Sequence, residues 1–239
     1  MIIIKKDILV IDIGTHKAEE VWLFEGSPRI TFKTLITLLR GHGPVKCFFE
    51  LLEIKRLSKN IKENFNFRYV LIEPIVHKEI LEFLHSTQSI FVGGVSSCQP
   101  SGPLQLLMAK DSLGNSIVSE KPGLTGEKRE TYNINFQSLY SFLIKNFLQK
   151  NQTHGLLLRI NAEGVEGPII EHVLETIIKP LVIAGSLGDI KKCFGQEALD
   201  RINRKINDSG IPFVYLTSNP NTWSLGLRSI GKHLNHQID

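Results

Sequence analysis

Short apolar runs recur along the chain, and each is bounded by glycine, proline or polar residues. The first run, Ile8–Ile13, is apolar except for Asp12 and ends at Gly14. A continuous apolar run is typical of a central strand that is covered on both faces of a parallel sheet. Five further runs fit strands of this kind: Tyr69–Ile72, Ser89–Val92, Gly155–Ile160, Pro180–Ala184 and Pro212–Leu216.

Helical patterns lie between several of these runs. The apolar spacing predicts helices over His77–His85, Gly167–Ile178 and Gln196–Asn207. Strands that alternate with helices indicate an α/β domain with a mostly parallel central sheet and helices on both faces. We therefore predict one such domain over residues 1–239.

Two stretches exceed what a minimal domain of this class needs. Residues 25–68 form a mainly helical insertion, because apolar positions recur there every three or four residues. These positions are Phe48, Leu51, Ile54, Leu57, Ile61 and Phe65. A surface helix packed on the sheet, a lid, a dimerisation arm and an acceptor-binding element are the alternatives. Residues 96–133 read as a long loop with one strand-like piece, Leu104–Met108.

Composition narrows the class of protein. With 42% hydrophobic and 22% charged residues, the chain can bury a core and is not disordered. A net charge of +4 is too small an excess to predict a nucleic-acid partner. No apolar run approaches the length of a membrane span, and the amino-terminal segment lacks the features of a signal peptide. The widely spaced Cys47, Cys98 and Cys193 predict no disulfide framework, so we expect a cytoplasmic protein.

Polar residues follow three of the predicted strands, where an open α/β sheet has its ligand crevice. Gly14 lets the backbone approach a ligand at the start of a helix. Glu73 offers a carboxylate acceptor suited to a ribose diol, and Asn161, Glu163 and Glu166 follow the fourth strand. The structural alternatives are a plain turn at Gly14, a solvated strand end at Glu73, and a place for Glu163 or Glu166 in the first turn of a helix.

Two classes of ligand are disfavoured by what these junctions lack. The dinucleotide fingerprint GxGxxG is absent, because Gly14 stands alone and Ala18 occupies the place of a later glycine. This argues against NAD, whose pyrophosphate needs close backbone contact. No cluster of His, Asp or Glu has the spacing of a metal site, and we predict no metal.

Four segments, in the same order, resemble those of FkbM-family methyltransferases: VIDIGTHKAEE, VLIEPIVHKEILEFL, LQLLMAKDSLGNSI and LLLRINAEGVEGPIIEHVL. That family typically has a strand into DxGAxxG, then FEPNP with a helix, a Lys-Asp and Gly-Asn-Ser loop, and a strand into KxDVEGxE. The match is spread over most of residues 7–178 and leaves the insertion unmatched. The resemblance implies a Rossmann-like class I methyltransferase fold, with S-adenosylmethionine as cofactor. It also implies an antiparallel edge strand, for which Trp223–Leu227 is the candidate.

The resemblance further implies a place for individual residues around the cofactor. The methionine moiety and the sulfonium would face Asp12, Gly14 and Thr15. The ribose would be held by Glu73, which Pro74 follows. The adenine would lie near Ser96 or Ser97, and the transferred methyl near Asn161 and Glu163. A loop that helps to cover the acceptor would contain Lys110, Asp111, Asn115 and Ser116, with Glu166 nearby.

The implied reaction is an attack by a hydroxyl oxygen on the sulfonium methyl, so the protein must align the reactants and relieve the hydroxyl of its proton. Glu163 is the first candidate base and His16 the second. Asn161 stands where the family usually has aspartate, and an amide can hydrogen-bond but cannot act as a base. Ala18 replaces the family's second glycine. The implied acceptor is a hydroxyl on a sugar, glycan, lipid or natural product.

Two rival functions stay open at this point. A methyltransferase fold that has lost its chemistry would act as a cofactor-binding or interaction module, and Ala18 and Asn161 favour it. A sugar-kinase or actin-like ATPase also opens with a strand followed by Asp12, Gly14 and Thr15. Such an ATPase needs a second phosphate loop, for which residues 185–189 are a poor substitute. A homo-oligomer is compatible with either reading.

Overall fold

The core of the protein is a six-stranded parallel sheet. The computed structural model describes residues 5–110, 114–150 and 153–238, with the side chains to residue 236. The strand order is β3-β2-β1-β7-β8-β9, and every neighbouring pair is parallel. The strands are β1 (Lys6–Ile13), β2 (Phe65–Glu73), β3 (Ser89–Gly93), β7 (Gly155–Ile160), β8 (Val182–Gly185) and β9 (Phe213–Tyr215). The six predicted strands are therefore confirmed, with ends that shift by a few residues.

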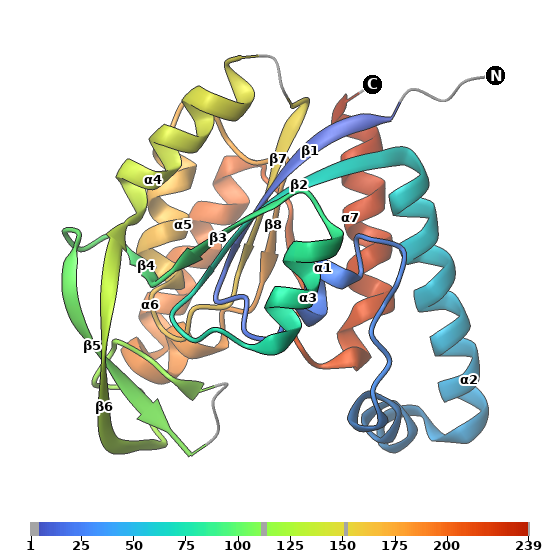
Figure 1. The fold of residues 1–239 in the computed structure, drawn as a ribbon, viewed down its shortest axis with the longest axis horizontal. Helices are drawn as coiled ribbons and strands as arrows, with labels where there is room; N and C mark the ends of the chain where they lie inside the picture. The colour runs from blue at the N-terminus through green and yellow to red at the C-terminus, as the bar shows by residue number, and fades with distance from the viewer. Residues whose placement is uncertain (1–4, 111–113, 151–152, 239) are drawn as a thin grey trace.

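Helices cover both faces of this sheet, as Figure 1 shows. On one face lie α1 (Glu19–Trp22), α2 (Phe32–Asn64), α3 (Lys78–Ser86) and α7 (Trp223–Ile238). On the other lie α4 (Phe136–Leu143), the π-helical turn η2 (Ile144–Leu148), α5 (Glu166–Glu175) and α6 (Gly188–Ser209). Alternate residues of β1 serve the two cores, since Ile8 and Val10 pack in the first and Leu9 and Ile11 in the second. The architecture is α/β and consistent with a Rossmann-like fold.

The predicted antiparallel edge strand is wrong. Trp223–Leu227 is the start of the helix α7, which follows a short 3₁₀ turn, η3 (Pro220–Thr222). Buried apolar residues recur along α7 at helical spacing: Trp223, Leu227, Ile230 and Leu234. This period fits a helix face and not a strand, so burial of the stripe against the sheet favours the helix.

The predicted helical insertion is the crossover between β1 and β2. Its helix α2 is bent at Gly43, which has a φ of 74° and is followed in the chain by Pro44. The helix packs on α7. Ile54, Leu57 and Ile61 lie on the buried face of α2, as the stripe predicts. Phe48, a member of the same predicted stripe, is largely exposed.

The stretch predicted as a long loop contains a second, three-stranded sheet. Its strands are β4 (Val95–Ser97), β5 (Gly102–Ala109) and β6 (Leu124–Asn135), in the order β4-β6-β5. β5 includes the predicted piece Leu104–Met108 and pairs antiparallel with β6, whereas β4 pairs parallel with β6. This small sheet lies beside the main sheet (Figure 1).

The two ends of the described chain lie on one side of the molecule. In Figure 1, β1 begins and α7 ends at the top of the view, whereas the carboxyl ends of the parallel strands point toward the bottom. Within the described ranges, no helix has both the length and the apolar character that crossing a bilayer requires.

Candidate functional site

A small cavity of about 60 Å³ lies where the carboxyl ends of β1, β2 and β7 meet the second sheet. Its walls include nine of the residues predicted for the site: Gly14, His16, Glu73, Pro74, Ser96, Asn115, Ser116, Asn161 and Glu163. Apolar side chains complete the walls, among them Ile13, Ile72, Val95, Leu106 and Ile117. The topology therefore brings most of the predicted site together from five separate parts of the chain.

The turn at Gly14 owes its glycine to a close approach within the chain. Gly14 has a φ of 74°, and a Cβ there would stand 2.1 Å from the carbonyl oxygen of Asn161. The amides of Gly14 and Asn161 donate to the carbonyls of Ile72 and Ile13, both at 2.9 Å. The three strand ends are thus locked together by backbone contacts, and Gly14 is needed for that contact whether or not a ligand lies nearby.

Glu73 is the carboxylate in the cavity wall. Its side chain is buried, and the whole residue is 8% exposed. One carboxylate oxygen accepts from the amide of His16 at 2.9 Å and the other from the amide of Ile75 at 3.2 Å. Burial raises the pKa of Glu73. Because a carboxylate oxygen has two lone pairs, each oxygen retains acceptor capacity for a ligand.

Asp12, which was predicted to face the cofactor, lies outside the cavity. It is fully buried and accepts from Arg159 Nη1 at 2.8 Å, while Arg159 Nη2 donates to Glu20 at 2.5 Å. Nη1 also donates to the carbonyl of Gly14 at 2.7 Å. Burial raises the pKa of Asp12, and raises that of Glu20 to about 7. Asp12, Arg159 and Glu20 therefore form a buried ionic group that supports the Gly14 turn from behind.

Sequence reasoning missed Arg159 and Glu20, although one signal was available. Arg159 is the charged residue within the apolar run Gly155–Ile160, as Asp12 is within Ile8–Ile13. Asp12 and Arg159 face each other in the register of β1 and β7. Opposite charges inside two buried neighbouring strands point to such a pair, because neither is stable there alone.

Two more residues predicted for the cofactor, Thr15 and Ser97, lie outside the cavity wall. Thr15 is buried, and its hydroxyl donates to the carbonyl of Asp12 at 3.1 Å. Ser97 is buried, and its hydroxyl donates to the side-chain oxygen of Asn133 at 2.9 Å. Ser96 does line the cavity, although its hydroxyl donates to the carbonyl of Ile134 at 3.1 Å. Thr15 and Ser96 thus bond backbone carbonyls, as short polar side chains commonly do, whereas Ser97 bonds a side chain.

The segment after β7 is held by the carboxylate of Glu166. Glu166 is fully buried in the first turn of α5 and accepts from the amides of Ala162 and Gly164 at 2.9 and 2.8 Å. Burial raises its pKa to about 7. Glu166, predicted to bind the acceptor, lies outside the cavity wall and serves the loop. This outcome matches the structural alternative for that residue.

Glu163, the first candidate base, lines the cavity with a φ of 53° and forms an ion pair with Lys121. Ser116 donates to the backbone carbonyl of Glu163 at 2.5 Å. Leu107 and Ser116 exchange two backbone hydrogen bonds. These contacts fasten residues 114–121 to the end of β7. We call residues 114–120 the covering segment, because Asn115, Ser116 and Ile117 line the cavity.

The predicted acceptor loop is divided between two hollows. Asn115 lines the cavity, and its side-chain oxygen accepts from the amide of Ala109 at 2.9 Å. Its side-chain nitrogen is buried and has no partner among the described residues. Lys110 lies in a neighbouring cleft that also contains Lys121. Asp111 lies outside the described residues.

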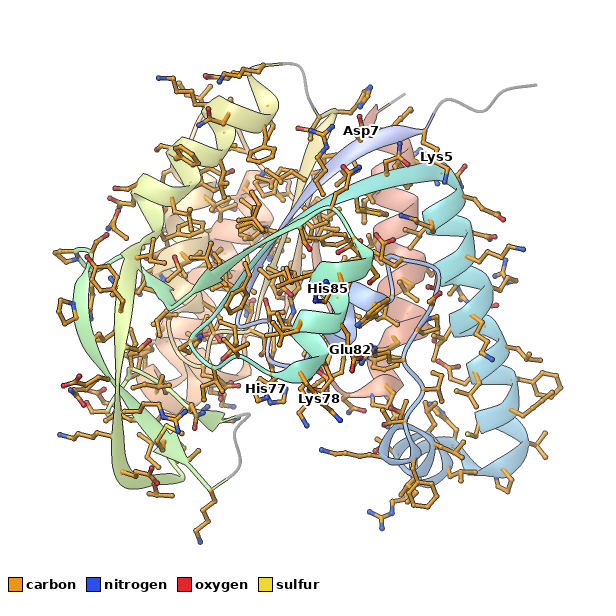
Figure 2. All side chains as sticks on the ribbon, viewed as in Figure 1. Lys5, Asp7, His77, Lys78, Glu82 and His85 are labelled. Atoms are coloured by element: carbon orange, nitrogen blue, oxygen red, sulfur yellow. The ribbon has the colours of Figure 1, made fainter. Side chains whose placement is uncertain are left out.

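His16, the second candidate base, lies between the cavity and a larger polar cleft of about 540 Å³. Its ring centroid is 4.6 Å from that of His77, and its Nδ1 is 3.7 Å from a carboxylate oxygen of Glu19. Figure 2 shows His77 and Lys78 at the lower end of α3. His16 therefore lines both the cavity and the polar cleft.

Two features outside the cavity bear on the rival functions. Ala18, at the place of the family's second glycine, has a φ of 60° and packs fully buried in the core. Its methyl group thus occupies core space and not the cavity wall. Residues 185–189 were the candidate for a second phosphate loop. A Cβ at Gly185 would stand 1.9 Å from the carbonyl oxygen of Ile160, so the glycine that begins this segment is required for packing against the end of β7. Among the described residues, no group of three or more His, Cys, Asp or Glu has the arrangement of a metal site.

Comparison with known proteins adds no relative. No protein-family model, curated protein or solved structure matches the chain. The resemblance to FkbM-family methyltransferases stays a prediction from the sequence. The geometry of the cavity is therefore the basis for any functional assignment.

Proposed function

We propose that the cavity binds S-adenosylmethionine and that the protein is an O-methyltransferase for a hydroxyl on a sugar, glycan, lipid or natural product. The observation that carries this proposal is the buried carboxylate of Glu73 in the wall of a crevice at the strand ends. A carboxylate at the end of the second strand is the acceptor that a ribose diol requires. Its position is fixed by the amides of His16 and Ile75.

The side chains of the cavity wall suit the nucleoside part of this cofactor in chemical character. Apolar walls from Ile72, Val95 and Leu106 suit a purine, and the unpartnered side-chain nitrogen of Asn115 supplies a hydrogen-bond donor. The volume of about 60 Å³ is well below the roughly 300–1,000 Å³ of cofactor pockets. The proposal therefore requires the covering segment, residues 114–120, to move outward when the cofactor binds.

When bound, S-adenosylmethionine supplies an activated methyl group. The residues of this chain then have two tasks, which are to orient the acceptor hydroxyl and to take its proton. His16 is the better-placed base, because the carboxylate of Glu163 is engaged by Lys121. The amide of Asn161 can hold a hydroxyl but not accept its proton.

Calorimetry with S-adenosylhomocysteine tests the cofactor assignment. We expect the unmodified chain to bind it and Glu73→Gln to bind about tenfold or more weakly, since a charge-assisted hydrogen bond contributes about 1.5–3 kcal/mol. Glu127→Gln, at an exposed position of β6, is the matched control and should bind like the unmodified chain. Thermal unfolding checks that each variant folds. Absence of binding to the unmodified chain would refute the proposal.

A second candidate function is binding of the cofactor without methyl transfer. It is favoured by the amide at Asn161 and by the ion pair that occupies Glu163. Transfer of labelled methyl from S-adenosylmethionine to a panel of sugars, glycans and lipids separates the two functions. If only Asn161→Asp transfers methyl, lost acidity at this position explains the difference; transfer by the unmodified chain rules out the binding-only function.

A further inference from the structure

The bend of α2 forms an exposed elbow at the edge of the molecule. Gly43 breaks the helix with a φ of 74°, and Pro44 starts the second arm. Apart from the adjacent residues and turns of α2 itself, no atom of the described residues lies within 4 Å of the place where a Cβ of Gly43 would stand, so the bend is open. Figure 1 shows the two arms meeting at the lower right, away from the central sheet.

One side of the second arm carries an unburied apolar stripe. Val45, Phe48, Phe49 and Leu52 recur at helical spacing and are 69, 59, 63 and 49% exposed. We call these four residues the elbow stripe. The opposite side of the arm already supplies Cys47 and Ile54 to the core. The fold therefore does not need the elbow stripe, and exposed apolar clusters of this kind mark interaction sites.

The helix α2 also carries an excess of positive charge. The helix contains seven basic and three acidic residues, an excess equal to the net +4 of the whole chain. Arg40 and Lys46 flank the bend, and neither has a carboxylate partner among the described residues. On the same helix Glu53 is paired with Arg56 and Arg228. Further along the helix Lys59 and Lys62 are paired with Glu63 and Glu25. Over residues 40–56, which include the elbow stripe, the basic residues Arg40, Lys46, Lys55 and Arg56 still outnumber the acidic residues Glu50 and Glu53.

We propose that the elbow stripe inserts into the headgroup region of an anionic lipid bilayer. Aromatic and aliphatic side chains beside Lys and Arg are the composition of interfacial helices, which lie on a membrane without crossing it. Anionic lipid complements the charge of α2. A second copy of the chain does not, because a two-fold contact sets the same positive surfaces against each other.

This placement also bears on the acceptor. The first arm of α2 contributes Lys33, Thr34 and Thr37 to the polar cleft that His16 shares with the cavity. An elbow bound to a bilayer brings this cleft to the lipid surface. Resting on the proposed function, this selects a lipid-linked hydroxyl among the four acceptor classes. The membrane proposal itself needs no cofactor.

Vesicle co-sedimentation tests the proposal. We expect vesicles of equal parts phosphatidylcholine and phosphatidylglycerol to bind the chain about tenfold or more tightly than phosphatidylcholine vesicles, and added salt to weaken the binding. The double variant Phe48→Ser, Phe49→Ser should lose about tenfold, and so should Arg40→Glu, Lys46→Glu. Ile177→Ser is the matched control, because Ile177 is 99% exposed and lies outside α2.

Circular dichroism confirms that the variants fold, as expected for changes at exposed positions. Equal binding to both kinds of vesicle, or full binding by the double phenylalanine variant, overturns the proposal. So does a dimer in solution that the same double variant dissociates, because the elbow stripe is then a contact between copies. S-adenosylhomocysteine binding is measured separately, so a failure of the proposed function leaves this test intact.

Discussion

At the scale of single residues, Gly14 and Gly43 illustrate two different reasons why a position needs glycine. Gly14 and Gly43 share a φ of 74°, which L side chains rarely adopt. A Cβ at Gly14 meets the carbonyl of Asn161 at 2.1 Å, whereas a Cβ at Gly43 meets nothing within 4 Å. The sequence predicts glycine-dependent turns, but it does not reveal which neighbour makes the glycine necessary.

Alanine substitution at these two positions gives a matched pair. Gly43→Ala should lower the free energy of unfolding by about 1–2 kcal/mol, the cost of the left-handed conformation alone. Gly14→Ala should lower it by roughly 2 kcal/mol more, because the strand ends must also move apart. Urea unfolding measures both values. Equal losses would show that the contact at Asn161 relaxes without cost.

At the scale of elements, the second sheet supplies one wall of the cavity through β4 and β5. β6 escaped prediction because its residues 125–131 are polar or glycine and its central part is exposed, so no apolar alternation marks it. Trp223–Leu227 was misassigned because the edge strand was expected from the family resemblance, whereas the residues themselves begin a helical apolar stripe that continues to Leu234. By contrast, β1 and β7 are buried on both faces, and their apolar runs identify them.

The ion pair of Lys121 with Glu163 should hold the covering segment closed. Lys121→Met removes the pair and should speed amide hydrogen exchange at Leu107 and Ser116 by about fivefold, the equivalent of ~1 kcal/mol. Lys128→Met, at an exposed position of β6, should leave both rates unchanged. Unchanged exchange in the Lys121 variant would show that the backbone bonds alone keep the segment in place.

At the scale of the whole molecule, the group of Asp12, Glu20 and Arg159 joins β1, α1 and β7 at the centre of the fold. The sequence predicts where the strands end and therefore most of the cavity wall. It does not predict how Asp12 is used, since that depends on the register of β1 with β7. From the sequence alone, Asp12 at the end of a strand is therefore interpreted as a ligand-binding carboxylate, because its pairing with Arg159 is not apparent there.

Removal of the guanidinium should destabilise the entire domain. Arg159→Met leaves two buried carboxylates without a counter-charge and should lower the free energy of unfolding by about 3–5 kcal/mol. The loss should be larger at pH 8 than at pH 5: burial raises the pKa of Glu20 to about 7, so at pH 5 its carboxyl is protonated. Arg201→Met, which breaks the surface pair with Glu171, should cost less than about 1 kcal/mol. A loss at Arg159 no greater than this control would contradict the supporting role.

The position of the two ends of the described chain has a practical consequence. In Figure 1, β1 begins and α7 ends opposite the carboxyl ends of the parallel strands and the elbow. Both hollows include residues that follow these strand ends, so a fluorophore or surface tether joined beyond either end of the described chain stands clear of them. A molecule anchored in this way presents the carboxyl ends of its strands outward. Ligands and vesicles can then be offered to one immobilised preparation in turn.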